Sequence, residues 1–126
     1  MENTNNYIHW YYNEDAKEFF KEFIKDVNEQ TKSPSIEWVD SCYHNDACGS
    51  VCFNLDNNGE NYVQLWAFHN DHEAKREDMM RYLAVSYRNG QEDGDLFYIT
   101  DDRQQAIKHA IEIAHNLKDK VLTNAD

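Results

Sequence analysis

Residues 49–69, GSVCFNLDNNGENYVQLWAFH, contain two short runs of strand-forming residues separated by a turn sequence. Residues 49–56 and 61–69 are rich in Val, Phe, Tyr and Trp, which pack well on a pleated sheet. The segment Asn57-Asn58-Gly59 between them is typical of a β-hairpin, because Asn and Gly adopt the positive φ angles that tight turns need. We therefore predict two antiparallel strands here, and residues 35–43 form a similar run just before them.

Residues 79–87 fit two kinds of secondary structure. Several of their apolar residues have helical spacing, whereas Leu83, Val85 and Tyr87 alternate with other residues as in a strand. We favour the strand, because an Asn-Gly turn follows it and a further strand-like run, residues 95–99, can pair with it.

One helix is predicted before these strands in the sequence and another after them. The first follows Asn13, which can cap its N-terminus, and ends before Ser33-Pro34, where helical geometry is disfavoured. The second begins near Thr100-Asp101-Asp102, which provides a cap and acidic residues in the first turn. The apolar stripes of the two helices consist of Ala16, Phe19, Phe20, Phe23, Ile24 and Val27, and of Ile107, Ala110, Ile111, Ala114, Leu117 and Val121.

These elements predict an α+β fold with a single domain over residues 1–126. An antiparallel sheet of about five short strands is flanked by an N-terminal and a C-terminal helix, and both helices pack against the sheet. No composition break or Gly/Ser-rich linker divides the 126 residues, and a chain of this length can bury one core.

The aromatic residues of 61–69 lie on one side of their predicted strand. Tyr62, Trp66 and Phe68 share one face, and Val63, Leu65 and Ala67 share the other. A sheet covered on both faces explains this pattern and is the simpler interpretation. The alternative is that the aromatic face is a contact surface, because Tyr and Trp are common interface anchors.

Acidic residues dominate the centre of the chain. The formal net charge is −12, and residues 37–102 carry fourteen acidic and four basic side chains, a net charge of −10. Many of these acids lie in three polar stretches that we expect to be loops. The candidate partner-binding residues are Asp56, Glu60, Asp71, Glu73, Glu77, Asp78, Glu92, Asp93 and Asp95.

This charge exceeds the magnitude of about 2–8 that keeps a small domain soluble. A basic protein that neutralises it is the expected partner, since complementary charge accelerates encounter and fixes orientation. Direct binding to nucleic acid or to an anionic membrane is not expected, because both require a basic surface.

Cys42, His44, Cys48 and Cys52 form the best candidate metal site of the sequence. Zinc is bound by such ligands, but the CxxC spacing that turns two thiolates toward one point is missing. A hairpin centred near Ala47 would place Cys42 opposite Cys52 as ordinary sheet residues. We therefore expect buried free thiols, with no metal and no cofactor.

His69 and His72, with Asp71 and Glu73, form a second polar group that could hold a metal or a general base. Their composition is more typical of a solvated loop. The sequence contains no GxSxG, HExxH or Gly-rich phosphate loop, so we expect a protein without catalytic activity. The odd number of cysteines and the absence of a signal-like N-terminus favour the cytoplasm.

Two functions of different classes fit these observations. The chain resembles, in size and acidity, small antagonists such as phage anti-CRISPR and anti-restriction DNA mimics, and immunity proteins that neutralise nuclease toxins. The resemblance implies an inhibitor that blocks a basic nucleic-acid-handling protein. The alternative is a small-molecule or metal-binding domain that uses the cluster between Cys42 and Cys52. A third possibility is a subunit of a larger assembly, in which the charge only keeps the protein soluble.

Overall fold

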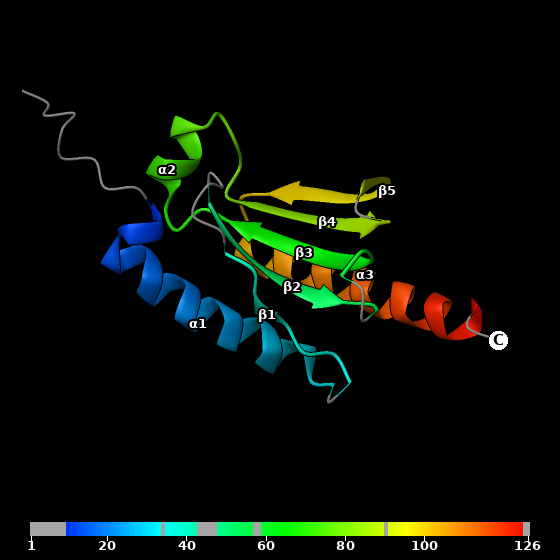
Figure 1. The fold of residues 1–126 in the computed structure, drawn as a ribbon. Helices are drawn as coiled ribbons and strands as arrows, with labels where there is room; N and C mark the ends of the chain where they lie inside the picture. The colour runs from blue at the N-terminus through cyan, green and yellow to red at the C-terminus, as the bar shows by residue number, and fades with distance from the viewer. Residues whose placement is uncertain (1–9, 34, 43–47, 57–58, 90, 125–126) are drawn as a thin grey trace, which may run out of the picture.

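The computed structural model describes residues 10–33, 35–42, 48–56, 59–89 and 91–124, without the side chains of 92–97 and 119–124. A short 3₁₀ helix, η2, leads into the first long helix (Figure 1). The elements, in chain order, are η2 (Trp10–Tyr12), α1 (Glu14–Thr31), β1 (Val39–Asp40), β2 (Gly49–Asn54), β3 (Tyr62–Ala67), α2 (Asp71–Arg76), β4 (Tyr82–Arg88), β5 (Gln91–Thr100) and α3 (Arg103–Asn124).

The five strands form one antiparallel sheet in the order β1-β2-β3-β4-β5. Each strand pairs with the one that precedes it in the chain, so the sheet is a meander. The expected α+β architecture is confirmed, and so is the strand at residues 79–87, which corresponds to β4 and pairs with β5. The strand expected at 35–43 is shorter than predicted, since β1 has two residues.

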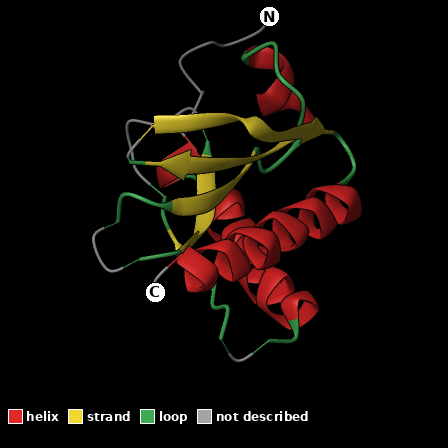
Figure 2. Ribbon diagram, turned by 90° about the vertical axis from the view of Figure 1, so that its right-hand side faces the viewer, coloured by secondary structure: helices red, strands yellow, loops and turns green. Residues whose placement is uncertain are grey.

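The two long helices pack against the same face of the sheet, as Figure 2 shows from the side. Phe23 and Val27 of α1 and Ile107 of α3 are fully buried with Val63 and Leu65 of β3. The fold is therefore a layer of helices on a layer of strands. On the other face, Ser50, Gln64 and Val85 are also buried, although neither long helix packs there.

Local hydrogen bonds explain where α1 begins and how the next segment returns to it. The Asn13 side chain accepts the backbone N–H groups of Asp15 (2.8 Å) and Ala16 (3.3 Å), so the predicted N-cap is confirmed. Near the other end, Asn28 exchanges two hydrogen bonds with the backbone of Trp38, at 3.0 and 2.8 Å. The buried Trp38 thereby fixes the segment before β1 against α1.

Two acidic stretches that were expected to be loops form regular structure. Asp71–Arg76 is the helix α2, whose N-cap Asn70 accepts the N–H of Glu73 at 2.8 Å. Residues 92–95 belong to β5. In the part of the chain that the structure describes, no helix combines the length and the apolar character needed to cross a membrane.

Candidate functional site

One face of the sheet carries no helix along most of its area (Figure 2). We call it the open face. At its centre, Gln64 donates a hydrogen bond to Ser50 Oγ (2.8 Å), and Ser50 Oγ is also 2.8 Å from Ser41 Oγ. These buried polar groups therefore satisfy one another. The described side chains of the open face, placed by strand register, are Val39, Ser41, Ser50, Cys52, Asn54, Tyr62, Gln64, Trp66, Leu83, Val85, Tyr87 and Ile99.

An exposed apolar area lies at one end of the open face. Met79 and Met80 are 41% and 45% exposed, and they line two depressions of about 390 Å³ each. Trp66 and Leu83 line one depression and Ile99 the other. We call these five residues the methionine patch. Methionine is flexible and polarisable, so such a surface adapts well to an apolar partner.

Backbone hydrogen bonds hold the loop that carries the two methionines. Met79 N–H donates to Ala74 O of α2 at 2.9 Å, and Phe68 N–H donates to Arg81 O at 2.9 Å. The Arg81 guanidinium donates through Nε to Phe68 O at 3.0 Å, and its backbone N–H donates to Asp101 Oδ1 at 2.9 Å. The methionine patch is therefore presented on a fixed turn between α2 and β4.

The structure separates the nine candidate acids into groups of different availability. Glu77 and Asp78 are exposed and border the methionine patch, each lining one of the two depressions together with one basic residue, Arg81 beside Glu77 and Lys75 beside Asp78. Glu60 is exposed in the turn between β2 and β3. Glu77, Asp78 and Glu60 are therefore available for contact with a partner.

The other candidates have local roles or lie outside the description. Asp71 contacts Arg81 at 3.7 Å, although its side chain is 77% exposed, and Glu73, whose side chain is 14% exposed, pairs with Arg76 at 3.6 Å. Asp56 accepts hydrogen bonds from Gly59 N–H and from Asn61, so it stabilises the hairpin turn. The side chains of the three candidates in β5, Glu92, Asp93 and Asp95, lie outside the described part.

The cysteines are free and occupy three different environments. Val39 lies opposite Cys52, so the predicted register, with Cys42 opposite Cys52, is wrong. Cys42 lines a cleft beside α1, whereas Cys48 packs with Phe68 and Ala74. Burial raises the pKa of the Cys52 thiol, and the Asp40 carboxylate adds to this effect.

The described residues therefore do not bring the cysteine cluster together. No three His, Cys, Asp or Glu side chains among them gather in a way that could hold a metal ion, and His44 lies outside this set. His69 is half-buried and His72 is exposed on α2. Burial lowers the pKa of His69, against the opposing effect of Glu73 and Asp15.

The methionines were missed as candidate functional residues. In the sequence, Met79 and Met80 directly follow two acids and precede the alternating pattern of β4. This position predicts an exposed turn, and it is the signal that could have identified the two methionines. Comparisons of the chain with protein-family models, with curated proteins and with solved structures find no match.

Proposed function

We propose that this chain is a non-enzymatic inhibitor that binds a basic nucleic-acid-handling protein through the methionine patch and its acidic border. A phage anti-defence protein and an immunity protein against a nuclease toxin are the two versions of this function. The observation that carries the proposal is the position of exposed Glu77 and Asp78 beside exposed Met79 and Met80.

Each part of this surface has a separate energetic role. Apolar side chains that lose water on binding supply affinity, about 25 cal/mol per Å² of apolar area removed from water. Carboxylates at the border act mainly on the association rate and on the choice of partner. A basic protein that handles nucleic acid offers arginine and lysine side chains where phosphates normally bind, so a carboxylate border can occupy the same groups.

The alternative based on the cysteine cluster is not favoured. Cys42 faces α1 and Cys52 belongs to the opposite face of the sheet, so the two thiols cannot act on one ligand without a change of register.

Affinity capture from a host lysate, at low and then at high salt, tests the proposal with three variants. The first, Met79→Ser with Met80→Ser, removes the exposed apolar surface. The second, Glu77→Gln with Asp78→Asn, removes two charges, and asparagine tolerates the positive φ of 54° at position 78. The matched control, Glu18→Gln with Glu22→Gln, removes two exposed charges of α1, on the other side of the sheet.

Wild type and the control should retain the same basic partner at low salt and release it at high salt. The methionine variant should lose it at both salt concentrations, and the Glu77/Asp78 variant should retain less of it. Capture that is equal for all four proteins would contradict the proposal, and so would a captured partner that is acidic.

A further inference from the structure

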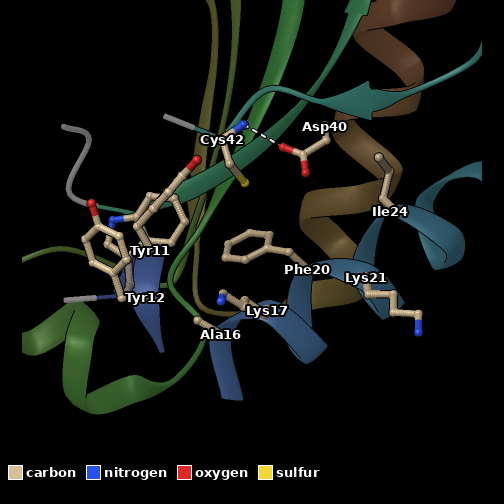
Figure 3. A pocket seen from close by; sticks show the side chains of 10 residues that line it. Tyr11, Tyr12, Ala16, Lys17, Phe20, Lys21, Ile24, Asp40 and Cys42 are labelled. Atoms are coloured by element: carbon tan, nitrogen blue, oxygen red, sulfur yellow. Dashed lines mark hydrogen bonds between the residues drawn. The ribbon is translucent and has the colours of Figure 1, made fainter. Parts of the chain in front are cut away.

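A second concave surface lies on the opposite side of the sheet from the methionine patch, between α1 and the β1 edge (Figure 3). Its volume is about 670 Å³, within the range of small-molecule sites, which is about 300–1,000 Å³. It is lined by Trp10, Tyr11, Tyr12, Ala16, Lys17, Phe20, Lys21, Ile24, Asp40 and Cys42. None of the candidate partner-binding acids whose side chains are described lines it.

Aromatic rings form much of the wall of this cleft. The centre of the Trp10 ring lies 5.7 Å from that of Phe20, with the two rings tilted, and 5.5 Å from that of Tyr11, with the two rings edge-on. Tyr11 and Tyr12 are 38% and 63% exposed. Tyr11 and Tyr12 therefore offer exposed ring surface on which a flat ligand can stack, whereas Trp10, which is 4% exposed, belongs to the base of the cleft.

Close packing of backbone and side chains closes the bottom of the cleft. A Cβ atom built on Gly49 would lie 2.5 Å from Phe20 Cζ and 2.8 Å from Cys42 Sγ. In Figure 3 the Cys42 thiol points toward the Phe20 ring. A glycine at position 49 is thus what allows β2, Phe20 and Cys42 to meet there.

The charge of the lining differs from that of the whole chain. Lys17 and Lys21 lie one turn apart on α1, and Asp40 is the one acid among the described residues of the lining. Asp40 already accepts the backbone N–H of Cys42 at 2.7 Å. Lys17 contacts Glu14 at 3.5 Å in an exposed pair, which a ligand can replace at little cost. The lining residues that the structure describes have a net charge of +1 in a chain of −12, so they match a ligand with a single negative charge.

We infer that this cleft binds a small planar aromatic monocarboxylate. The ring stacks against Tyr11 and Tyr12 above the buried Trp10, and the carboxylate accepts hydrogen bonds from Lys17, with Lys21 at the rim. A cation would also find aromatic faces here, but it would meet two like charges.

The chain contains three tryptophans, one for each region to be distinguished: Trp10 in the cleft, Trp38 in the core and Trp66 in the methionine patch. Fluorine NMR of the fluorotryptophan-labelled protein therefore reports on the three places separately. Indole-3-acetate, tryptamine and indole have the same ring with a negative, a positive and no charge, and they serve as matched probes.

Indole-3-acetate should shift the Trp10 signal and leave those of Trp38 and Trp66 in place, with an affinity about tenfold above that of tryptamine. The variant Lys17→Gln with Lys21→Gln should lose about tenfold in that affinity. The control Lys25→Gln with Lys108→Gln removes two exposed lysines outside the cleft and should bind as wild type does.

Equal affinities for indole-3-acetate and tryptamine would overturn the inference. An equal loss of affinity for indole-3-acetate in the cleft variant and in the control variant would also overturn it, and so would a Trp10 signal that no probe shifts. An unchanged circular dichroism spectrum shows that each variant is folded. Because Trp66 reports on the methionine patch, failure here is distinguishable from failure of the proposed inhibitor function.

Discussion

The rings of Tyr62 and Tyr87 stack across β3 and β4, with their centroids 4.5 Å apart and an angle of 18° between their planes. The two residues are direct partners in the strand register and lie on the open face. Both are half-buried although no helix among the described elements covers them. Burial raises the pKa of Tyr62 above its ordinary value. The open face is thus stiffened at the end opposite the methionine patch.

A double-mutant cycle with Tyr62→Ala and Tyr87→Ala should give a coupling energy of about 0.5–1.5 kcal/mol, the usual value for an aromatic pair. Chemical denaturation of the four proteins measures it. Additive effects of the two substitutions would show that the stack contributes nothing beyond the burial of each ring.

The contact between α1 and α3 includes an ion pair that should be measurable. Arg103 donates from Nε (3.2 Å) and from Nη2 (2.9 Å) to Asp26 Oδ2, and both side chains are about one-third exposed. The Arg103 guanidinium also lies 5.0 Å from the centre of the Phe23 ring. The double-mutant cycle Asp26→Ala and Arg103→Ala should give a coupling of about 1 kcal/mol that decreases with salt. The exposed pair of Glu14 and Lys17 is the control, with an expected coupling below about 0.5 kcal/mol. A coupling no larger than that of the control would contradict this prediction.

Protonation of His69 should reduce stability in weakly acidic solution. Its pKa is lowered in the folded protein, so below the ordinary value of 6.5 the unfolded chain binds more protons than the folded one. The free energy of unfolding should therefore decrease as the pH falls from about 7 to about 5, and this part of the decrease should disappear in His69→Gln. Denaturation at several pH values measures both proteins. Parallel curves for the two would show that His69 does not contribute.

Gly49→Ala should destabilise the fold, because the new methyl group would lie 2.5 Å from Phe20 Cζ. We expect a loss of about 1–3 kcal/mol, the usual cost of excess volume in a packed region. Gly59→Ala is the control with a different mechanism, since its Cβ meets nothing within 4 Å but its φ is +73°. That strain costs about 1–2 kcal/mol.

In a double variant with Phe20→Leu, which shortens the side chain, part of the loss at Gly49 should be recovered, whereas the loss at Gly59 should be unchanged. Equal recovery at both positions would contradict the packing explanation.

Local sequence patterns predicted most of the fold correctly. Asn13 satisfies the free N–H groups at the start of α1, and the alternation of Leu83, Val85 and Tyr87 belongs to a strand with an antiparallel partner. These features depend on neighbours in the chain, and for this reason a sequence shows them. The short helix α2 also had a local signal, since Asn70 followed three residues later by Glu73 is a capping pattern. We interpreted that stretch as a loop because its composition is polar.

The candidate site was harder to predict, because it depends on contacts between distant segments. A meander with two helices can carry them on one face or on both, and the apolar stripes of α1 and α3 are compatible with either. The open face, and with it the exposure of Met79, results because both long helices pack on the same side of the sheet. The strand register also depends on contacts between distant segments. Cys52 lies opposite Val39, which is three residues from the predicted partner, Cys42. This register separates two thiols that a symmetrical hairpin would place opposite each other.

The most direct test of the central claim is the association rate of the purified chain with its captured partner as a function of salt concentration. Electrostatic attraction accelerates association at low salt and is screened within about 8 Å at physiological ionic strength. We predict that the wild-type rate constant falls at least about tenfold between low and high salt, and that Glu77→Gln with Asp78→Asn makes this dependence shallower than Glu18→Gln with Glu22→Gln does. A wild-type rate that stays constant across this range would show that the charge only keeps the protein soluble, and would contradict the account.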